Sequence, residues 1–178
     1  MRLFTAVDIP DGVKSALGRT LERFRPMAKF KWTDVENLHI TTKFIGEWPE
    51  ARLEELTEVL NGVGSPGLIQ IQIRGLRWVP DPRHPRMLWA GVESGPELDS
   101  LARETEQAVH GLGVAVEDRK YSPHLTLARI RDRVPLDTLR RAIDAEGSAD
   151  FGSFAAPAFY LYLSKDGRYS KLAEFSLV

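Results

Sequence analysis

The chain of 178 residues contains no cysteine, no long hydrophobic run and no excess of basic charge. The absence of cysteine excludes disulfide bonds and thiolate metal sites. No apolar stretch approaches the roughly 20 residues that a membrane-spanning helix needs. The opening MRLFTAVDIP lacks the apolar core of a signal peptide. We therefore expect a soluble, cytoplasmic protein that neither enters nor binds a membrane.

The charge balance limits the ways in which this chain can bind nucleic acid. It has 24 basic and 25 acidic residues, a net charge of −1. Proteins that coat long nucleic acids usually carry a basic excess, because neutralising phosphates supplies most of their affinity. Any contact with nucleic acid is therefore expected to be local, with a short end or a single nucleotide held in a pocket.

The hydrophobic pattern predicts a mixed protein forming a single domain over residues 1–178. Strands are expected near residues 3–9, 39–45, 69–73, 87–92, 114–116, 124–128, 154–163 and 172–177. Helices are expected near residues 13–24, 53–60, 98–109 and 136–143. Residues 77–86, rich in proline and arginine, are expected to form a loop.

One pattern occurs twice, about half a chain apart. A His-x-Thr strand, at His39 and again at His124, is followed in each case by a helix that begins near a proline. The repetition predicts an internally duplicated α+β fold. We expect two pseudo-symmetric, interleaved lobes of antiparallel sheet, with helices outside and a central cleft between the lobes.

Alternate side chains of a strand point to the same face. His39 therefore shares a face with Thr41, and His124 shares a face with Thr126, while apolar neighbours point to the core. The pattern alone leaves open that both histidines are half-buried and simply hydrogen-bonded to the backbone. The matching context of the two pairs favours a functional site instead.

Two histidines facing one phosphorus atom can divide acid and base work, because the imidazole pKa lies near neutral pH. One would accept a proton from attacking water, and the other would protonate the departing oxygen. The two threonine hydroxyls would donate to the non-bridging phosphate oxygens. This scheme needs no metal and no cofactor.

A metal site is the competing use of histidine, but the chain has no HExxH motif, and a hydroxyl is a poor zinc ligand. His84 lies in a loop, and His110 lies at a helix end, where capping is the simpler account. We expect neither to be catalytic.

The chain also resembles a known family, over nearly its whole length. The resemblance rests on residues 2–10, 36–47, 85–92, 123–129 and 172–175. These segments are similar to those of the two-histidine phosphoesterases, specifically the RNA 2′,3′-cyclic phosphodiesterases, also called 2′-5′ RNA ligases, of the LigT/ThpR group. The resemblance implies a bilobal fold whose two motifs face each other across a cleft.

The resemblance also implies roles. His39 would protonate the 3′ leaving oxygen and His124 would activate water, so that an RNA 2′,3′-cyclic phosphate end yields a 2′-phosphate end. Family members can also join certain RNA halves through a 2′-5′ bond. The alternatives are a protein that is mainly a 2′-5′ RNA ligase, a phosphodiesterase for small cyclic nucleotides, and a noncatalytic RNA-end binding module. We expect a monomer acting on RNA ends or short oligonucleotides.

Further residues are predicted to contact the substrate. Lys43 has the strand parity of His39 and could extend the cationic wall of the cleft, or could be a solvated strand-end lysine. Arg129 has the opposite parity to His124 and reaches the phosphate only if the strand bulges or ends near Ala128. In the family that the chain resembles, an arginine commonly closes this second motif.

Aromatic and basic side chains add weaker candidates. Phe4 and Tyr121, with Trp32 and Phe44, are candidate stacking partners for a terminal base, although Phe44 is expected in the core and Phe4 could be either. Arg74, Arg77, Arg83 and Arg86 would either steer the RNA backbone or form ordinary soluble surface.

Overall fold

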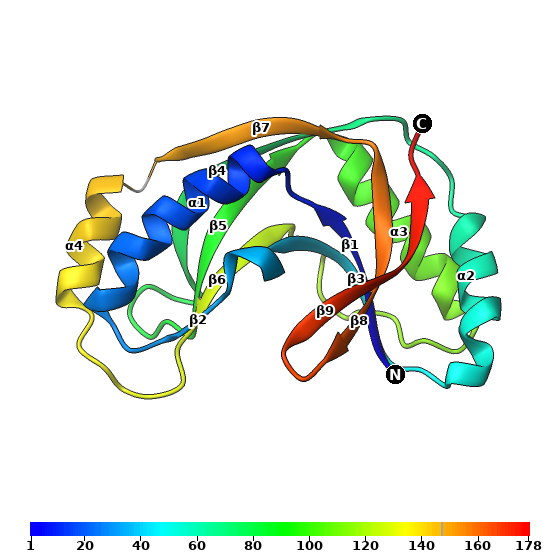
Figure 1. Cartoon of the computed structure of the whole chain (residues 1–178), viewed down its shortest axis with the longest axis horizontal. Helices are drawn as coiled ribbons and strands as arrows, with labels where there is room; N and C mark the ends of the chain where they lie inside the picture. The colour runs from blue at the N-terminus through cyan, green and yellow to red at the C-terminus, as the bar shows by residue number, and fades with distance from the viewer. Residues whose placement is uncertain (147) are drawn as a thin grey trace.

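Two antiparallel sheets carry the fold in the computed structural model, which describes residues 1–146 and 148–178 (Figure 1). The first sheet has the strand order β3 (His39–Glu47), β1 (Arg2–Asp8), β8 (Ala158–Lys165) and β9 (Arg168–Ser176). The second sheet has the order β2 (Lys31–Trp32), β6 (His124–Arg129), β5 (Met87–Ser94), β4 (Ile69–Val79) and β7 (Asp150–Ala156). Strands β3 and β6, which carry the two His-x-Thr motifs, contact each other where the sheets meet.

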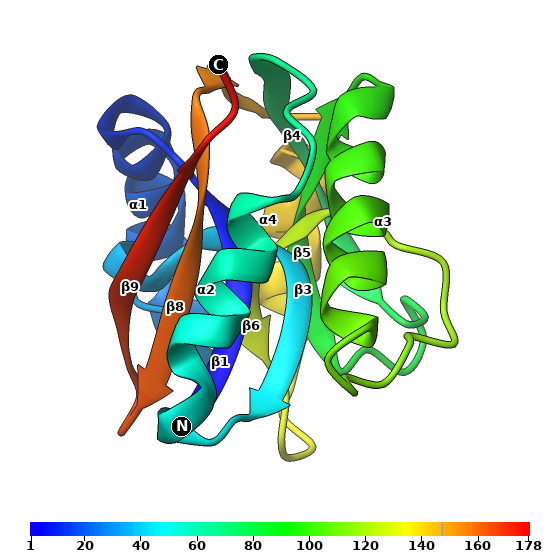
Figure 2. The same ribbon diagram turned by 90° about the vertical axis from the view of Figure 1, so that its right-hand side faces the viewer.

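Four helices pack on the outer sides of the sheets. Helices α1 (Asp11–Phe24) and α4 (Asp137–Glu146) pack on the second sheet. Helices α2 (Leu53–Asn61) and α3 (Pro96–His110) cover the first, and Figure 2 looks onto this pair. Short 3-10 turns occur at Arg25–Met27, Val35–Asn37 and Glu50–Arg52. We call the side of each sheet opposite its packed helices the helix-free face.

The two halves of the chain are interleaved. Helix α1 follows β1 of the first sheet but packs on β7 of the second, whereas α3 follows β5 of the second sheet and packs on β3 of the first. A constant offset of 85 residues separates the starts of β1 and β5, of α1 and α3, and of β3 and β6. The prediction of an α+β fold with two antiparallel sheets and helices outside is confirmed.

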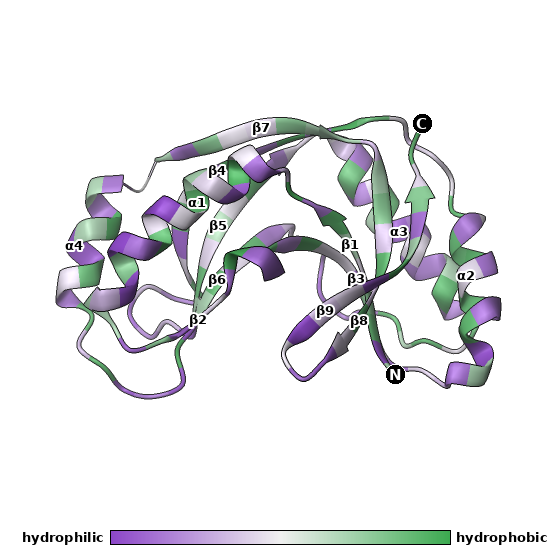
Figure 3. Ribbon diagram, viewed as in Figure 1, coloured by the Kyte–Doolittle hydropathy of each residue, from purple (hydrophilic) through white to green (hydrophobic). Residues whose placement is uncertain are grey.

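Burial of apolar stripes holds the helices to the sheets. On α1 the side chains of Val13, Leu17 and Leu21 recur at helical spacing, and all three are buried. On β4 the alternate residues Ile69 and Ile73 are fully buried. Each such side chain contributes about 1.5–3 kcal/mol through the hydrophobic effect. Figure 3 shows the resulting alternation of hydrophobic and hydrophilic residues along the helices. Among the described residues no helix has the length and apolarity to cross a membrane.

Three local predictions are wrong. Strand β4 continues through Arg77 to Val79, so the loop begins later than the arginine content suggested. No strand forms at 114–116, where the Ala115 carbonyl accepts a hydrogen bond from the Lys43 ammonium. The strand expected over 154–163 breaks at Pro157, which has no N–H to donate, and its two parts belong to different sheets.

Candidate active site

A β-bulge in each motif strand sets the direction of the side chains that follow the threonine. In β3, Thr41 lies opposite Ala6 but Lys43 lies opposite Thr5, so Thr42 has no partner in the register. In β6 the same irregularity falls on Leu127. Because an extra residue reverses the alternation of side chains, residues after each bulge point to the face opposite the one that period two predicts.

His39 and His124 are held in the same way. The Nδ1 atom of His39 donates to the carbonyl of Asn37 at 2.6 Å, and that of His124 donates to the carbonyl of Ser122 at 2.7 Å. A carbonyl only accepts, so Nδ1 carries the hydrogen and Nε2 is left to give or take a proton. Both rings are half-buried on the helix-free faces. The hydrogen bonds to the backbone that a purely structural role would involve are therefore present, and they also orient both Nε2 atoms.

The charges beside the two rings differ. Asp8 lies directly opposite His39 across β1 and β3, whereas Gly91 lies opposite His124 across β5 and β6. Burial lowers the pKa of His39, while the Asn37 carbonyl and the Asp8 carboxylate act in the raising direction. Burial also lowers the pKa of His124, the Ser122 carbonyl opposes this shift, and the positive charge of Arg129 adds to it.

The two imidazoles are close enough to influence each other. A positive charge on His124 lowers the pKa of His39. A proton on His124 therefore disfavours a proton on His39. Asp8 favours the proton on His39, and Arg129 disfavours it on His124.

Aromatic rings fix both imidazoles in place. The ring of Trp89 stacks on His124 with centroids 3.6 Å apart and planes 10° apart. His39 packs against Phe4, with centroids 4.7 Å apart, and meets the edge of Tyr169 at 5.1 Å. These contacts restrict ring rotation, so each Nε2 keeps its direction.

Hydroxyl and guanidinium donors lie on the histidine faces. Thr41 and Thr126 are half-buried, and within the described part of the chain neither hydroxyl has a hydrogen-bond partner. Arg129 follows the bulge at Leu127, so it points to the helix-free face of the second sheet. The sequence required a bulge or a strand end near Ala128 for Arg129 to share the face of His124, and the bulge is present. The charge of Arg129 also lowers the pKa of His124.

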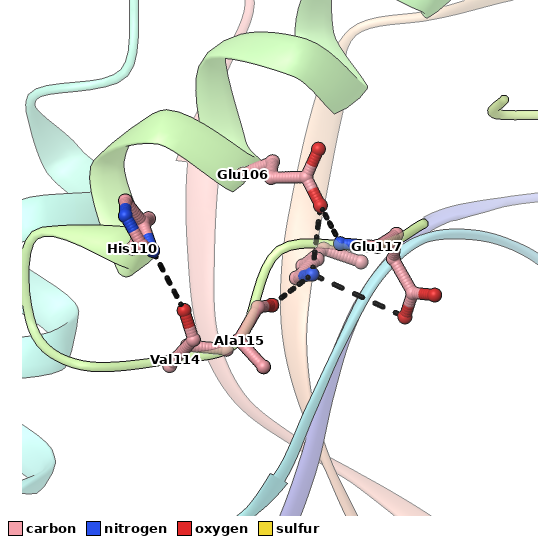
Figure 4. Close-up of polar contacts among 6 residues, drawn as sticks. Glu106, His110, Val114, Ala115 and Glu117 are labelled. Atoms are coloured by element: carbon pink, nitrogen blue, oxygen red, sulfur yellow. Dashed lines mark hydrogen bonds and ion pairs between the residues drawn. The ribbon is translucent and has the colours of Figure 1, made fainter. Parts of the chain in front are cut away.

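The prediction that Lys43 lines the cleft is wrong. The bulge at Thr42 turns Lys43 to the helix side of the first sheet, where it is 4% exposed. Its ammonium donates to Glu106 of α3 at 3.0 Å and to the Ala115 carbonyl at 2.9 Å. The Glu106 carboxylate also accepts the N–H of Glu117 (Figure 4). Lys43 thus ties the segment after α3 to the sheet.

Phe44 lies outside its expected place, and Phe4 takes the buried one of its two alternatives. Phe44, expected in the core, is 58% exposed because the bulge turns it toward the helix-free face beside Phe4. Phe4 is 4% exposed and covered by Tyr162, so the prediction that it offers an open surface to a base is wrong. It supports His39 instead.

Other aromatic candidates serve the scaffold. The Tyr121 hydroxyl donates to the Thr41 carbonyl at 2.9 Å, and burial raises the pKa of this phenol, which keeps the donor proton. This bond joins the segment before His124 to β3. A contact of Tyr121 with substrate remains a prediction. The Trp32 indole donates to the Ala28 carbonyl and packs against Phe30, away from the histidines.

The remaining basic candidates separate. Arg74 lies 3.9 Å from the Glu93 carboxylate, whereas Arg77 is exposed and lies directly opposite Trp89. Arg83 lies in the loop after β4, and Arg86 lies just before β5. His84 is exposed in the same loop, and His110, the last residue of α3, bonds the Val114 carbonyl (Figure 4).

Sequence reasoning missed Asp8 and Trp89. Asp8 ends β1 and Trp89 lies in β5, so only strand pairing brings them to the histidines. A cavity of about 210 Å³ opens beside His39, and Asp8, Tyr162 and Lys171 are among its lining residues. Across the described residues, no three His, Asp or Glu side chains converge as ligands of one metal ion would.

Comparison with known proteins places the chain among phosphoesterases. A family model described as LigT-like phosphoesterase matches residues 7–89 and 91–169. An RNA 2′,3′-cyclic phosphodiesterase of Methanocaldococcus jannaschii is 35% identical over 164 residues, which cover 92% of this chain and 91% of that protein.

Solved structures agree on the fold. A protein of Thermus thermophilus has a TM-score of 0.79 and 28% identity, with 99% of this chain and 98% of that one covered. E. coli LigT in complex with 3′-AMP has a TM-score of 0.77 and 22% identity, over 98% of this chain and 97% of that one.

Proposed function

The chain belongs to the LigT-like phosphoesterase family, and we propose that it opens 2′,3′-cyclic phosphates at RNA ends by acid–base catalysis between His39 and His124. The observation that carries this proposal is the matched pair of imidazoles. Each is anchored through Nδ1 to the carbonyl two residues earlier, and each is close enough to the other for their charges to interact. In this scheme one phosphate group lies between the two Nε2 atoms and contacts both.

The neighbouring charges support a direction for the reaction. Asp8 favours a protonated His39, so His39 is the acid that protonates the departing 3′ oxygen. Arg129 favours a neutral His124, so His124 is the base that takes a proton from water. The water oxygen bonds to phosphorus as the P–O3′ bond breaks, which leaves a 2′-phosphate and a 3′-hydroxyl. One proton moves from water to His124, and one moves from His39 to the 3′ oxygen. After the reaction His124 is therefore protonated and His39 is neutral.

Hydrogen-bond donors are needed to stabilise the negative charge that develops on the non-bridging phosphate oxygens in the transition state. The hydroxyls of Thr41 and Thr126 share the faces of the two histidines, and the Arg129 guanidinium follows on the second sheet. Donors placed in advance at such oxygens typically contribute about 2.7–4 kcal/mol each to transition-state stabilisation. No step of this scheme uses a metal ion.

The same acid and base can also serve ligation. If the 5′-hydroxyl of another RNA replaces water as the nucleophile, His124 takes its proton, His39 protonates the departing 3′ oxygen, and a 2′-5′ linkage forms. A chain that is mainly a ligase, or one that prefers small cyclic nucleotides, would use the same residues. The products therefore have to be identified.

The test is incubation with an oligoribonucleotide that ends in a 2′,3′-cyclic phosphate, in the presence of EDTA. We expect product with 2′-phosphate ends from the parent protein and from His84→Ala, a histidine variant outside the site. His39→Ala and His124→Ala should each lose at least 100-fold in rate, given the usual contribution of about 10²–10⁴ from a general acid or base. Full activity in either site variant, or activity abolished by EDTA, would show that this mechanism is wrong. Binding without turnover in the parent would identify a noncatalytic RNA-end binding module.

A further inference from the structure

A row of directly opposed residues crosses the helix-free face of the second sheet next to the second histidine motif. Thr126 of β6 lies opposite Trp89 of β5, and Trp89 lies opposite Arg77 of β4. Directly opposed residues point to the same face. Arg77 therefore shares the face of Thr126 and lies two strands away, at about 10 Å between backbones.

The neighbouring residue confirms the direction of Arg77. Trp78 is 8% exposed, and Arg140 of α4 lies over its ring at 5.3 Å. Trp78 is thus on the helix side of β4. Because successive side chains alternate and no bulge falls between these two residues, Arg77 points to the helix-free face.

A second row adds another cation. Lys31 of β2 lies opposite Arg129 of β6, so both side chains share this face. Of the residues that the structure describes, no carboxylate lies within 4.0 Å of Lys31, Arg77 or Arg129, whereas Arg74 on the same strand as Arg77 has Glu93. The face that carries His124 thus holds three cations without a carboxylate at that distance, in a chain whose net charge is −1.

We propose that Arg77 and Lys31 bind the sugar–phosphate backbone of the RNA strand that leads into the cyclic end, with Arg77 holding the first internucleotide phosphate. This inference rests on the proposed function, because it takes the cyclic phosphate to lie between His39 and His124. The long side chain of Arg77 can extend over part of the roughly 10 Å between its backbone and that of Thr126, toward a phosphate next to the cyclic one. The guanidinium fork suits a phosphate diester, which offers two non-bridging oxygens.

The consequence is a substrate class. A mononucleotide 2′,3′-cyclic phosphate has no internucleotide phosphate and gains nothing from Arg77. An oligonucleotide with the same terminal nucleoside has this phosphate and can bind Arg77 through it. The site should therefore favour cyclic ends of RNA strands over free cyclic nucleotides, although the chain as a whole carries no basic excess.

The experiment compares kcat/KM for 2′,3′-cyclic AMP with kcat/KM for a short oligoribonucleotide that ends in adenosine 2′,3′-cyclic phosphate. For Arg77→Gln we expect about a tenfold loss on the oligonucleotide, the effect of one charge-assisted hydrogen bond, and less than a twofold change on 2′,3′-cyclic AMP. The dependence of the oligonucleotide rate on salt should become shallower by about 0.7 in logarithmic slope. Arg77→Lys keeps the positive charge, so its dependence of rate on salt should stay close to that of the parent. The control is Arg103→Gln, an exposed arginine on the outer helix α3, which should leave both rates unchanged.

The outcomes separate the two proposals. If the parent hydrolyses neither substrate, the proposed function fails. If the parent hydrolyses both, and Arg77→Gln lowers both rates equally or changes neither, the function stands and this inference is overturned. An equal loss on the oligonucleotide in Arg103→Gln would also overturn it, because the effect would then come from overall charge.

Discussion

Arg129 and Phe44 occupy matching places in the two motif strands: each lies five residues after the histidine, just beyond a β-bulge, on the helix-free face. The two motif strands thus follow His124 with a guanidinium and His39 with an exposed aromatic ring. Positive charge lowers the pKa of His124 from the second sheet, while Asp8 acts on His39 from the first. Burial lowers the pKa of both histidines, but the charged side chains beside them act in opposite directions, Asp8 upward and Arg129 downward.

Replacement of Asp8 by asparagine should move one limb of the pH profile. The active form has His39 protonated, and activity is lost at high pH as His39 loses its proton. Burial lowers the pKa of His39, and the Asp8 carboxylate opposes this shift. In Asp8→Asn this pKa falls further, so the alkaline limb of kcat/KM moves to lower pH. Tyr162→Phe, which removes the hydroxyl bonded to Asp8 but keeps its charge, should leave the limb in place. A shift of the acidic limb instead would reverse the assignment of acid and base.

Replacement of Arg129 by glutamine should move the other limb. Activity is lost at low pH as His124 gains a proton, and the Arg129 charge lowers the pKa of His124. In Arg129→Gln this pKa rises, and the acidic limb moves to higher pH. The rate at the optimum should fall as well, by about tenfold, because a phosphate donor is lost. A profile of unchanged shape would show that Arg129 does not act on His124.

Removal of the indole that stacks on His124 should lower kcat more than it changes KM. Trp89 restricts the imidazole from one side, and misplacement by about 1 Å can cost up to 100-fold in rate. We expect Trp89→Leu to lose about 10- to 100-fold in kcat. Trp89→Phe keeps an aromatic face and should recover most of the rate, since the indole nitrogen is buried without a hydrogen-bond partner among the described residues. Equal activity of the leucine and phenylalanine variants would refute a positioning role.

Loss of the buried ammonium of Lys43 should destabilise the fold. Lys43→Met removes the ammonium that donates to Glu106 and to the Ala115 carbonyl, and leaves Glu106 with only the N–H of Glu117. We expect the free energy of unfolding to fall by about 2–3 kcal/mol, less than for a fully buried pair because Glu106 is 26% exposed. Urea denaturation would measure it, with the exposed Lys29→Met as the control. A change below about 0.5 kcal/mol, the usual range for surface sites, would contradict the role given to Lys43.

The sequence correctly predicted the features that depend only on the periodicity of side chains within one strand or one helix. His39 with Thr41 and His124 with Thr126 lie on the faces that period two gives, and the helices follow their apolar stripes. Predictions failed just beyond Thr42, because a bulge is set by pairing with another strand. Lys43 and Phe44 therefore point to the faces opposite those expected.

Long-range pairing also explains what was missed. Asp8 and Trp89 come beside the histidines only through their strands, and neither belongs to a local motif. The break at Pro157 shows the same limit, because a continuous apolar run gives no sign that its two parts join different sheets.

The central claim is that His39 and His124 act on the same phosphorus atom. The most direct measurement is a crystal structure with adenosine 2′-monophosphate, the product of the proposed reaction. We predict that oxygens of its phosphate lie within about 2.6–3.2 Å of the Nε2 atoms of both histidines. A phosphate that contacts only one imidazole, or that binds away from both, would contradict the account.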